Sequence, residues 1–176
     1  MNIRPAVAAD AHAIASVHVQ TWQAAYRDLV PDVYLSSLAI EPREQMWREW
    51  IRRGTPEVWV VEVGSRVVGW SAFGASRDPD AQPQTGELEA IYLLPEYWTT
   101  GTGWALWLTT RRRLMERGFS TATLWTLADN VRATRFYAAA HFALDEKSET
   151  EVTYGGKALK KVRYRTTFGK IAPDCA

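Results

Sequence analysis

The chain has 176 residues, a formal net charge of +1, and hydrophobic and charged fractions of 47% and 23%. This length suits one domain with an ordinary core, and the near-neutral charge gives no support for nucleic acid as a partner. No stretch approaches the ~20 apolar residues of a membrane span, and the N-terminus lacks the apolar core of a signal peptide, so we expect a cytoplasmic protein with no membrane partner.

The cysteine and histidine content gives no indication of a metal site. The single cysteine, Cys175, lies one residue from the C-terminus and can form neither an internal disulfide nor a cysteine-based metal site. His12, His18 and His141 lack metal-ligand spacing. We therefore predict no bound metal ion.

The first half of the chain predicts a short strand, helical segments and a hairpin. Ile3–Arg4 is the strand, and apolar residues recur at helical spacing after it, with Asp10 placed to cap the first helix. The predicted helical segments cover 7–29, 31–38 and 41–53. Two β-rich runs, 58–63 and 66–74, are separated by Gly64-Ser65 and predict a hairpin.

The second half alternates strands and helices after a long loop at 75–86, which contains two prolines, two aspartates and a terminal glycine. Strands are predicted at 87–94, 121–127, 142–146 and 160–168, and helices at 103–117 and 131–140. Gly118 is placed to end the first of these helices. A mixed α/β class with a central sheet follows, as one domain over 1–170 with a C-terminal tail at 171–176.

The stretch Tyr97–Trp104, YWTTGTGW, lies between a predicted strand and a predicted helix. The first turn of a helix leaves N–H groups unpaired and carries the positive end of the helix dipole, so it favours phosphate oxygens. Gly101 and Gly103 allow a phosphate to approach the backbone. Three hydroxyl donors accompany them, Thr99, Thr100 and Thr102. We therefore predict a phosphate-bearing cofactor here.

The common nucleotide-binding patterns do not fit this loop. No lysine occurs between 98 and 117, which excludes the nucleoside-triphosphate loop, and Leu106 stands at the third glycine position of the dinucleotide fingerprint. Instead, GELEAIYLLPEYWTTGTGWALW resembles the central motif of the GCN5-related N-acetyltransferases (GNAT). That motif has a Gln or Arg, two residues, Gly, one residue, then Gly or Ala, and here Trp98 stands at the Gln or Arg position.

A second stretch, DNVRATRFYAAAHF, resembles the second motif of the same family. The matching residues are Asn130, Ala133, Phe136, Tyr137 and Phe142, while His141 stands where the family usually has Gly. The N-terminal helices are also similar to those of bacterial members, so the resemblance covers nearly all of the chain. It implies the GNAT fold, a central mixed and mostly antiparallel sheet with a splayed parallel strand pair, flanked by helices.

The resemblance implies acetyl-CoA as cosubstrate, bound in the opening between two parallel strands with its pyrophosphate on the glycine loop. The cofactor-binding residues carried over are Ile91, Tyr92, Leu93, Trp98, Thr99, Thr100, Gly101, Thr102, Gly103, Trp104, Asn130, Ala133, Phe136 and Tyr137. We expect Trp98 to pack beneath the loop or beside the cofactor. The N–H groups of 91–93 are placed to polarise the thioester carbonyl.

Direct transfer of the acetyl group requires a base for the amine and an acid for the leaving thiolate. Tyr137 matches the tyrosine that often acts as the acid in this family. Glu87 matches the family's usual glutamate, and Glu89 lies two residues further along, so alternation on a strand directs both carboxylates to one side. Either could be the base. His18 falls on the apolar side of the first helix and is expected to be structural.

The predicted function is N-acetylation of the primary amine of a small molecule, such as an antibiotic or an amino-acid-like compound. The family builds its acceptor pocket from the first helices and neighbouring loops, where the candidates are Trp22, Tyr26, Tyr34, Trp47 and Trp50, with Trp70 or Trp125 as further candidates. Alternatives are a peptide or protein N-acetyltransferase, a non-catalytic acyl-CoA-binding module, and an interaction protein that uses exposed tryptophans. The resemblance also allows a homodimer.

Overall fold

The computed structural model describes residues 1–169, apart from the side chain of Lys147, and the predicted tail at 171–176 lies outside them. One seven-stranded sheet in the order β1-β2-β3-β4-β5-β7-β6 runs through this part of the chain. Its strands are β1 (Asn2–Pro5), β2 (Glu57–Val63), β3 (Arg66–Ala75), β4 (Thr85–Leu93), β5 (Thr121–Leu127), β6 (Ala143–Tyr154) and β7 (Lys157–Thr167). The α-helices are α1 (Ala11–Ala25), α2 (Asp32–Ser36), α3 (Ile40–Arg53), α4 (Thr102–Glu116) and α5 (Val131–Ala139).

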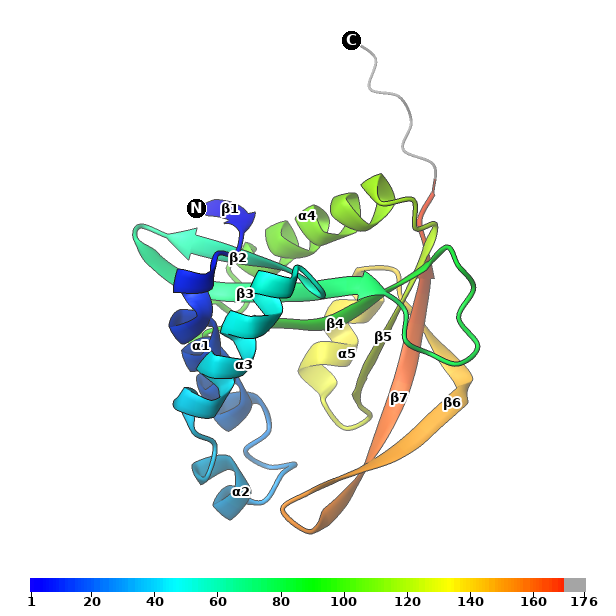
Figure 1. The fold of residues 1–176 in the computed structure, drawn as a ribbon. Helices are drawn as coiled ribbons and strands as arrows, with labels where there is room; N and C mark the ends of the chain where they lie inside the picture. Colours follow the sequence, from blue (N-terminus) through cyan, green and yellow to red (C-terminus); the bar gives the residue numbers. More distant parts are fainter. Residues whose placement is uncertain (170–176) are drawn as a thin grey trace.

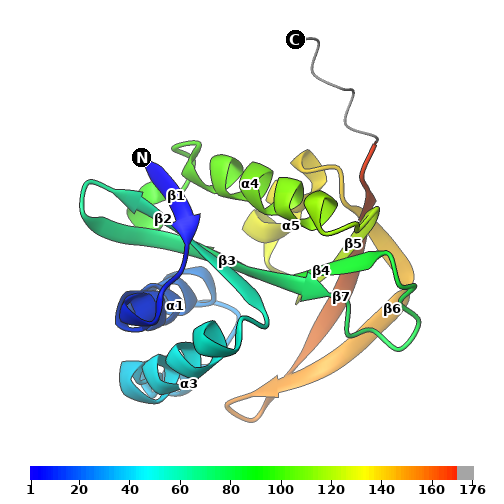
Figure 2. The same cartoon turned by 45° about the horizontal axis from the view of Figure 1, so that its top comes forward.

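Helices cover both faces of the sheet, with α1 and α3 on one side and α4 and α5 on the other (Figures 1 and 2). Two neighbouring residues of β3 contact helices on opposite faces of the sheet. Trp70 Nε1 donates to the carbonyl of Ile14 in α1 at 3.1 Å, while Ser71 Oγ lies 2.7 Å from Thr110 Oγ1 in α4. Because both faces are covered, the middle of β3 is buried without interruption.

The element predictions agree with this architecture in type, but the helix predicted over 7–29 is shorter, since α1 covers Ala11–Ala25, and two further places differ. β6 and β7 are longer than the predicted 142–146 and 160–168 and form one long hairpin, joined through Gly155 and Gly156, both at positive φ. Asp10 stands just before α1 but makes no side-chain capping bond. Its carboxylate instead accepts from the Arg4 guanidinium at 2.7 Å and from the Val7 N–H at 2.8 Å, so it joins β1 to the start of α1.

The strands β4 and β5 are the one parallel pair among the described strands, and they separate soon after they meet. Their pairing is confined to Thr85–Glu87 against Thr121–Thr123, whereas β4 stays paired with β3 as far as Leu93. β5 likewise stays paired with β7 as far as Leu127. The predicted mixed, mostly antiparallel sheet with a splayed parallel pair is therefore confirmed.

A bulge in β4 accompanies this separation. Ala72 of β3 pairs with Ala90 and the next residue, Phe73, pairs with Leu88, which leaves Glu89 as an extra residue in β4. Bulges bend a strand and change the direction of a side chain, and they are frequent beside active sites. In residues 1–169, no helix is long and apolar enough to cross a membrane.

Candidate active site

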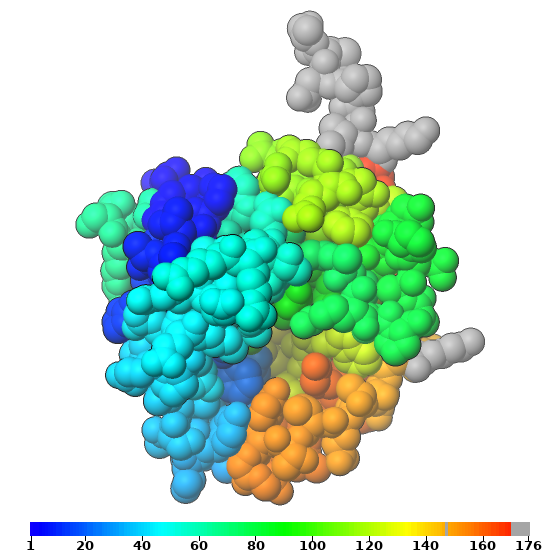
Figure 3. All heavy atoms as spheres, in the orientation of Figure 1, coloured from blue at the N-terminus to red at the C-terminus, as the bar shows by residue number. Residues whose placement is uncertain are grey.

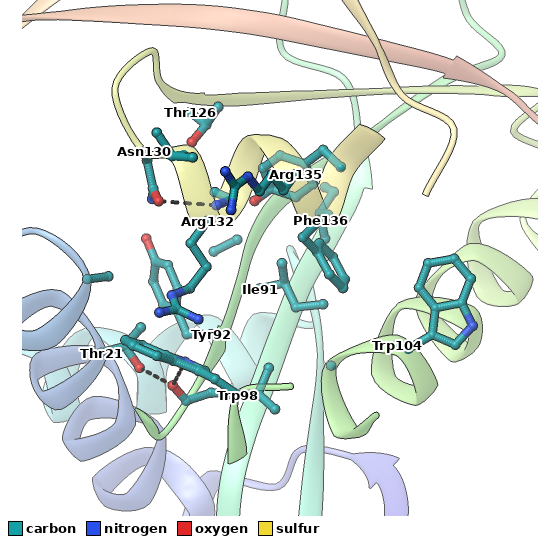
Figure 4. Close-up of a pocket in the computed structure, with 18 of the residues that line it drawn as sticks. Thr21, Ile91, Tyr92, Trp98, Trp104, Thr126, Asn130, Arg132, Arg135 and Phe136 are labelled. Atoms are coloured by element: carbon teal, nitrogen blue, oxygen red, sulfur yellow. Dashed lines mark hydrogen bonds between the residues drawn. The ribbon is translucent and has the colours of Figure 1, made fainter. Parts of the chain in front are cut away.

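The separation of β4 and β5 opens a cavity of about 740 Å³. Its walls come from β4, β5, the loop before α4, and the first turns of α5, with residues of α1 at one end (Figure 4). Of the residues predicted from the sequence, the following line it: Tyr26, Glu89, Ile91, Tyr92, Leu93, Trp98, Thr99, Gly101, Gly103, Trp104, Asn130, Ala133, Phe136 and Tyr137. Glu87, Thr100, Thr102, Trp22, Tyr34, Trp47 and Trp50 are not among the lining residues.

The edge of β4 that faces the cavity suits an extended ligand with amide groups. From Leu88 to Leu93, β4 has β3 on one side and no strand on the other, so its outward N–H and C=O groups have no ladder partner there. An extended chain that carries amides can pair with such an edge as an added strand would. The pantetheine arm of CoA has this chemistry, and the cavity residues therefore fit it.

The glycine loop leaves its backbone accessible at the start of α4. Gly101 has φ of +85° and nothing lies within 4 Å of the position where its Cβ would be. A Cβ on Gly103 would lie 3.4 Å from Leu93 Cδ1, against the cavity wall. Gly101 supplies the left-handed conformation that starts the helix, and the unpaired N–H groups of the first turn remain available for an anion.

The three threonine hydroxyls of the loop bond within the loop itself. Thr99 Oγ1 donates to the carbonyl of Trp98 at 2.6 Å, and Thr100 Oγ1 donates to the carbonyl of Tyr97 at 2.8 Å. Thr100 and Thr102 share a further bond of 2.9 Å. In this arrangement the hydroxyls fix the shape of the loop, and anion binding falls to the backbone.

Trp98, the departure from the family motif, lies on the cavity wall. Its Nε1 donates to the carbonyl of Leu93 at 3.0 Å, and the same carbonyl accepts from Thr21 Oγ1 at 2.8 Å. The guanidinium carbon of Arg132 lies 4.1 Å from the centre of the Trp98 ring (Figure 4). Arg132 and Arg135 were missed as site residues, although both lie within the second motif, DNVRATRFY.

The two candidate bases have different surroundings. Glu87 is 5% exposed and is held by Arg77, which donates from Nε at 3.1 Å, from Nη2 at 2.7 Å and from its backbone N–H at 3.1 Å. Glu89, the bulge residue, lines the cavity and has a single contact with Arg77, at 3.1 Å. Burial raises the pKa of Glu89, Arg77 opposes that rise, and the charge of Glu87 adds to it.

Tyr137 and Asn130 both come from α5. Burial, reinforced by Tyr92, raises the pKa of Tyr137 well above its usual value, so its phenol is protonated at neutral pH. Asn130 stands at the N-cap of α5, where its side chain accepts from the Ala133 N–H at 3.2 Å. Asn130 therefore fixes the start of the helix that carries Tyr137 into the cavity.

Most of the aromatic residues predicted for the acceptor pocket pack against one another. Trp47 lies 4.5 Å from Trp70 and 5.1 Å from Trp50 between ring centres, so this group belongs to the core between α3 and β3. Trp22 packs edge-on against Tyr26 at 4.9 Å. Of the predicted acceptor residues, Tyr26 and the further candidate Trp125 line the cavity, and Trp70 does not. Figure 3 shows a hollow bordered by the N-terminal helices in cyan, the loop after β3 in green and the β6–β7 hairpin in orange.

Comparison with known proteins gives one consistent result. The model of the acetyltransferase (GNAT) family matches residues 21–142. An uncharacterized N-acetyltransferase of Bacillus subtilis, YuaI, is 34% identical over 164 residues, which cover 92% of this chain and 90% of that protein.

Two solved structures share the fold. The PaiA N-acetyltransferase of Thermoplasma acidophilum in complex with coenzyme A has a TM-score of 0.77 at 18% identity, covering 95% of this chain and 98% of that one. YncA of Salmonella typhimurium with its cofactor acetyl-CoA has a TM-score of 0.72 at 20% identity, covering 100% and 99%. With the family model and the relative above, the chain belongs to the acetyltransferase (GNAT) family, whose enzymes use acetyl-CoA as cosubstrate.

Proposed function

We propose that this chain transfers an acetyl group from acetyl-CoA directly to the primary amine of a small molecule. The observation that carries the proposal is the position of Glu89, a carboxylate placed in the cavity by the β4 bulge, next to the unpaired strand edge. A base is needed beside the thioester because an ammonium group has no lone pair with which to attack. Glu89 accepts the proton that the amine gives up.

Glu89 suits this role better than Glu87. Glu87 is engaged by three donors of Arg77 and does not line the cavity, whereas Glu89 does line it and keeps one oxygen free of that ion pair. A base is most effective when its pKa lies near the working pH, and burial moves the pKa of Glu89 in that direction. In this proposal Glu87 fixes Arg77, and Arg77 positions Glu89.

Tyr137 is the proposed acid. Tyr137 has little contact with solvent, but it lines the cavity, and its phenol is protonated at neutral pH. It can therefore donate a proton to the departing thiolate. The outward N–H groups of β4 in the segment 91–93 are proposed to stabilise the negative charge that develops on the thioester oxygen. When bound, acetyl-CoA supplies the activated acetyl group.

A small acceptor fits the shape of the cavity where it opens to the surface. The hollow in Figure 3 is enclosed on three sides, by the N-terminal helices, the loop after β3 and the β6–β7 hairpin. Tyr26 and Tyr92 give the cavity an aromatic wall, and Glu89 gives it a negative charge. An amine carried on a compact apolar or aromatic body matches these features, since the cation is drawn to the carboxylate and the body to the rings.

The test is release of free thiol from acetyl-CoA across a panel of small primary amines and peptides with free N-termini. We expect turnover with members of the small-amine group, and a kcat lower by about 10²- to 10⁴-fold in Glu89→Gln with unchanged CoA binding. Tyr137→Phe is expected to lower kcat as well. Turnover with peptides alone would identify the acceptor as a peptide rather than a small molecule. CoA binding without turnover of any amine would identify the chain as a non-catalytic CoA-binding module.

A further inference from the structure

The loop before α4 has no cationic side chain. Between Pro95 and Thr110 the sequence contains no Lys, Arg or His, and its one charged residue, Glu96, pairs with Arg66 at 3.1 Å. CoA carries a pyrophosphate and a 3′-phosphate, both strongly anionic. The backbone of the loop therefore provides hydrogen bonds and a dipole but no full positive charge.

The missing charge lies across the opening, on α5. Among the described residues that line the cavity, the cationic ones are Arg132 and Arg135. Arg132 extends from the first turn of α5 toward the loop, where its guanidinium covers the ring of Trp98 at 4.1 Å (Figure 4). No carboxylate in residues 1–169 lies within 4.0 Å of the Arg132 guanidinium, so its charge is not neutralised by an ion pair there.

The indole of Trp98 is a fixed platform for this guanidinium. Its Nε1–H bond to the Leu93 carbonyl ties the ring to the end of β4, and Thr21 of α1 bonds to the same carbonyl. A guanidinium stacked on an aromatic face keeps the N–H donors at its edge free, and these match the geometry of phosphate oxygens. Stacking therefore orients Arg132 without consuming its hydrogen-bonding capacity.

We propose that the Trp98–Arg132 pair performs the task of the Gln or Arg side chain that the family motif carries at position 98. Trp98 positions the guanidinium, and Arg132 binds a phosphate group of CoA. The inference rests on cofactor binding, which belongs to the proposed function, and not on transfer to any acceptor. A protein that binds CoA but acetylates no amine would leave it intact.

The test is isothermal titration of CoA and dephospho-CoA into wild-type protein and Arg132→Gln. We expect the Kd for CoA to rise by about 10- to 100-fold in the variant, the loss typical of a hydrogen-bonded charge. An equal loss of affinity for both ligands would mean that Arg132 binds the pyrophosphate. A loss of affinity for CoA alone would mean that it binds the 3′-phosphate. In the active enzyme, the KM for acetyl-CoA rises while kcat changes little.

Further variants separate a direct role from a structural one. Arg132→Lys keeps the charge and is expected to recover part of the affinity, while Arg52→Gln removes a charge from the exposed surface of α3 and is expected to have no effect. Trp98→Leu removes the platform. Adding Arg132→Gln to this variant should therefore weaken CoA binding by a smaller factor than Arg132→Gln does in the wild type. Trp98→Gln restores the family side chain and should stay within about tenfold of wild-type affinity.

Two results would overturn the proposal. One is an Arg132→Gln variant whose affinities for both ligands stay within about twofold of wild type; a loss in Arg135→Gln would then assign the phosphate contact to Arg135. The other is tighter binding in Arg132→Gln, which would mean that the guanidinium obstructs the groove. Because Arg132 is exposed, the variant is expected to keep its fold, and a thermal melt checks this.

Discussion

Glu87 and Glu89 show how much a single residue's surroundings decide. These two carboxylates are two positions apart in one strand, and simple alternation gives them the same direction. The extra residue in the β3–β4 register places Glu89 in the cavity, while Arg77 holds Glu87 below the surface. The choice between two chemically identical groups therefore depends on one bulge and one arginine.

The pH dependence of turnover is expected to report on Glu89. A base acts in its deprotonated form, so kcat/KM falls as the pH drops through the pKa of Glu89. Arg77 lowers that pKa against the effect of burial. Arg77→Gln should therefore move the acidic limb of the profile to higher pH, and Glu89→Gln should abolish the limb. An acidic limb that persists unchanged in Glu89→Gln would assign the base elsewhere.

His18 is enclosed by aromatic rings and is expected to make stability sensitive to mild acid. Its ring centre lies 5.3 Å from that of Tyr92 and 5.6 Å from that of Trp22, and its buried Nδ1 has no partner among the described residues. Burial, with a smaller contribution from Arg43, lowers the pKa of His18 from 6.5 to about 4. The position on the apolar side of α1 agrees with the expected structural role.

Because the folded state binds this proton less readily than the unfolded chain, the unfolded state is favoured as the pH falls from 6.5 to about 4. The free energy of unfolding should drop by about 3 kcal/mol across that window. His18→Phe, which keeps a ring in the site, should remove most of the drop. Urea denaturation at a series of pH values across the same window measures the change. If the free energy of unfolding falls equally steeply with decreasing pH in both proteins, His18 is not the source of the drop.

At the scale of elements, the end of α5 shows a local conflict between sequence and backbone. His141, where the family usually has Gly, has φ of +62°. Its N–H bonds to the Ala138 carbonyl at 3.0 Å, and the Phe142 N–H bonds to the Tyr137 carbonyl at 2.9 Å. These two bonds form a Schellman motif, whose left-handed position favours Gly.

Replacing this residue is expected to stabilise the fold. His141→Gly removes the steric cost of a Cβ in the left-handed region and should raise the free energy of unfolding by about 1 kcal/mol, or Tm by roughly 2–4 °C. His141→Ala keeps the Cβ and is the matched control, so it should show no gain. Calorimetry of the three proteins compares them, and a His141→Gly protein that melts at or below wild type would contradict the strain.

At the scale of the whole molecule, a buried arginine joins the loop after β3 to the C-terminal hairpin. Arg163 of β7 is 6% exposed and contacts Asp78 at 3.2 Å, Asp80 at 2.6 Å and Asp145 at 2.8 Å. Asp78 also accepts from Trp125 Nε1 at 2.8 Å, at the cavity. This network fixes the loop that borders the hollow in Figure 3.

Breaking this network is expected to cost much more than breaking a surface pair. Arg163→Met leaves the buried carboxylate of Asp78, whose side chain is 9% exposed, without its charged partner and should lower the free energy of unfolding by about 3–5 kcal/mol. Arg165→Met removes a half-exposed arginine that contacts Asp80 and Asp145 at longer range, and should cost less than about 1 kcal/mol. Urea denaturation of both variants measures the free energy of unfolding. Similar decreases in the two would show that burial of Arg163 contributes little to stability.

The order and type of most elements, the family and the glycine loop could be predicted from the amino-acid sequence. These depend on local signals: apolar periodicity, turn residues, and two motifs at a fixed separation. The long β6–β7 hairpin was only partly predicted, because its strands are largely exposed and polar and so lack apolar alternation.

Which residues share the cavity depends on the folded chain. The bulge that separates Glu89 from Glu87 arises from the pairing of β4 with β3, which no local pattern encodes. Trp47 and Trp50 pack at the core rather than in the cavity because α3 turns Trp47 toward Trp70, and Trp50 packs against Trp47. Arg132 reaches Trp98 because β4 and β5 diverge and bring α5 opposite the loop. Each of these depends on contacts between residues far apart in the chain, and those contacts exist only once the sheet has formed.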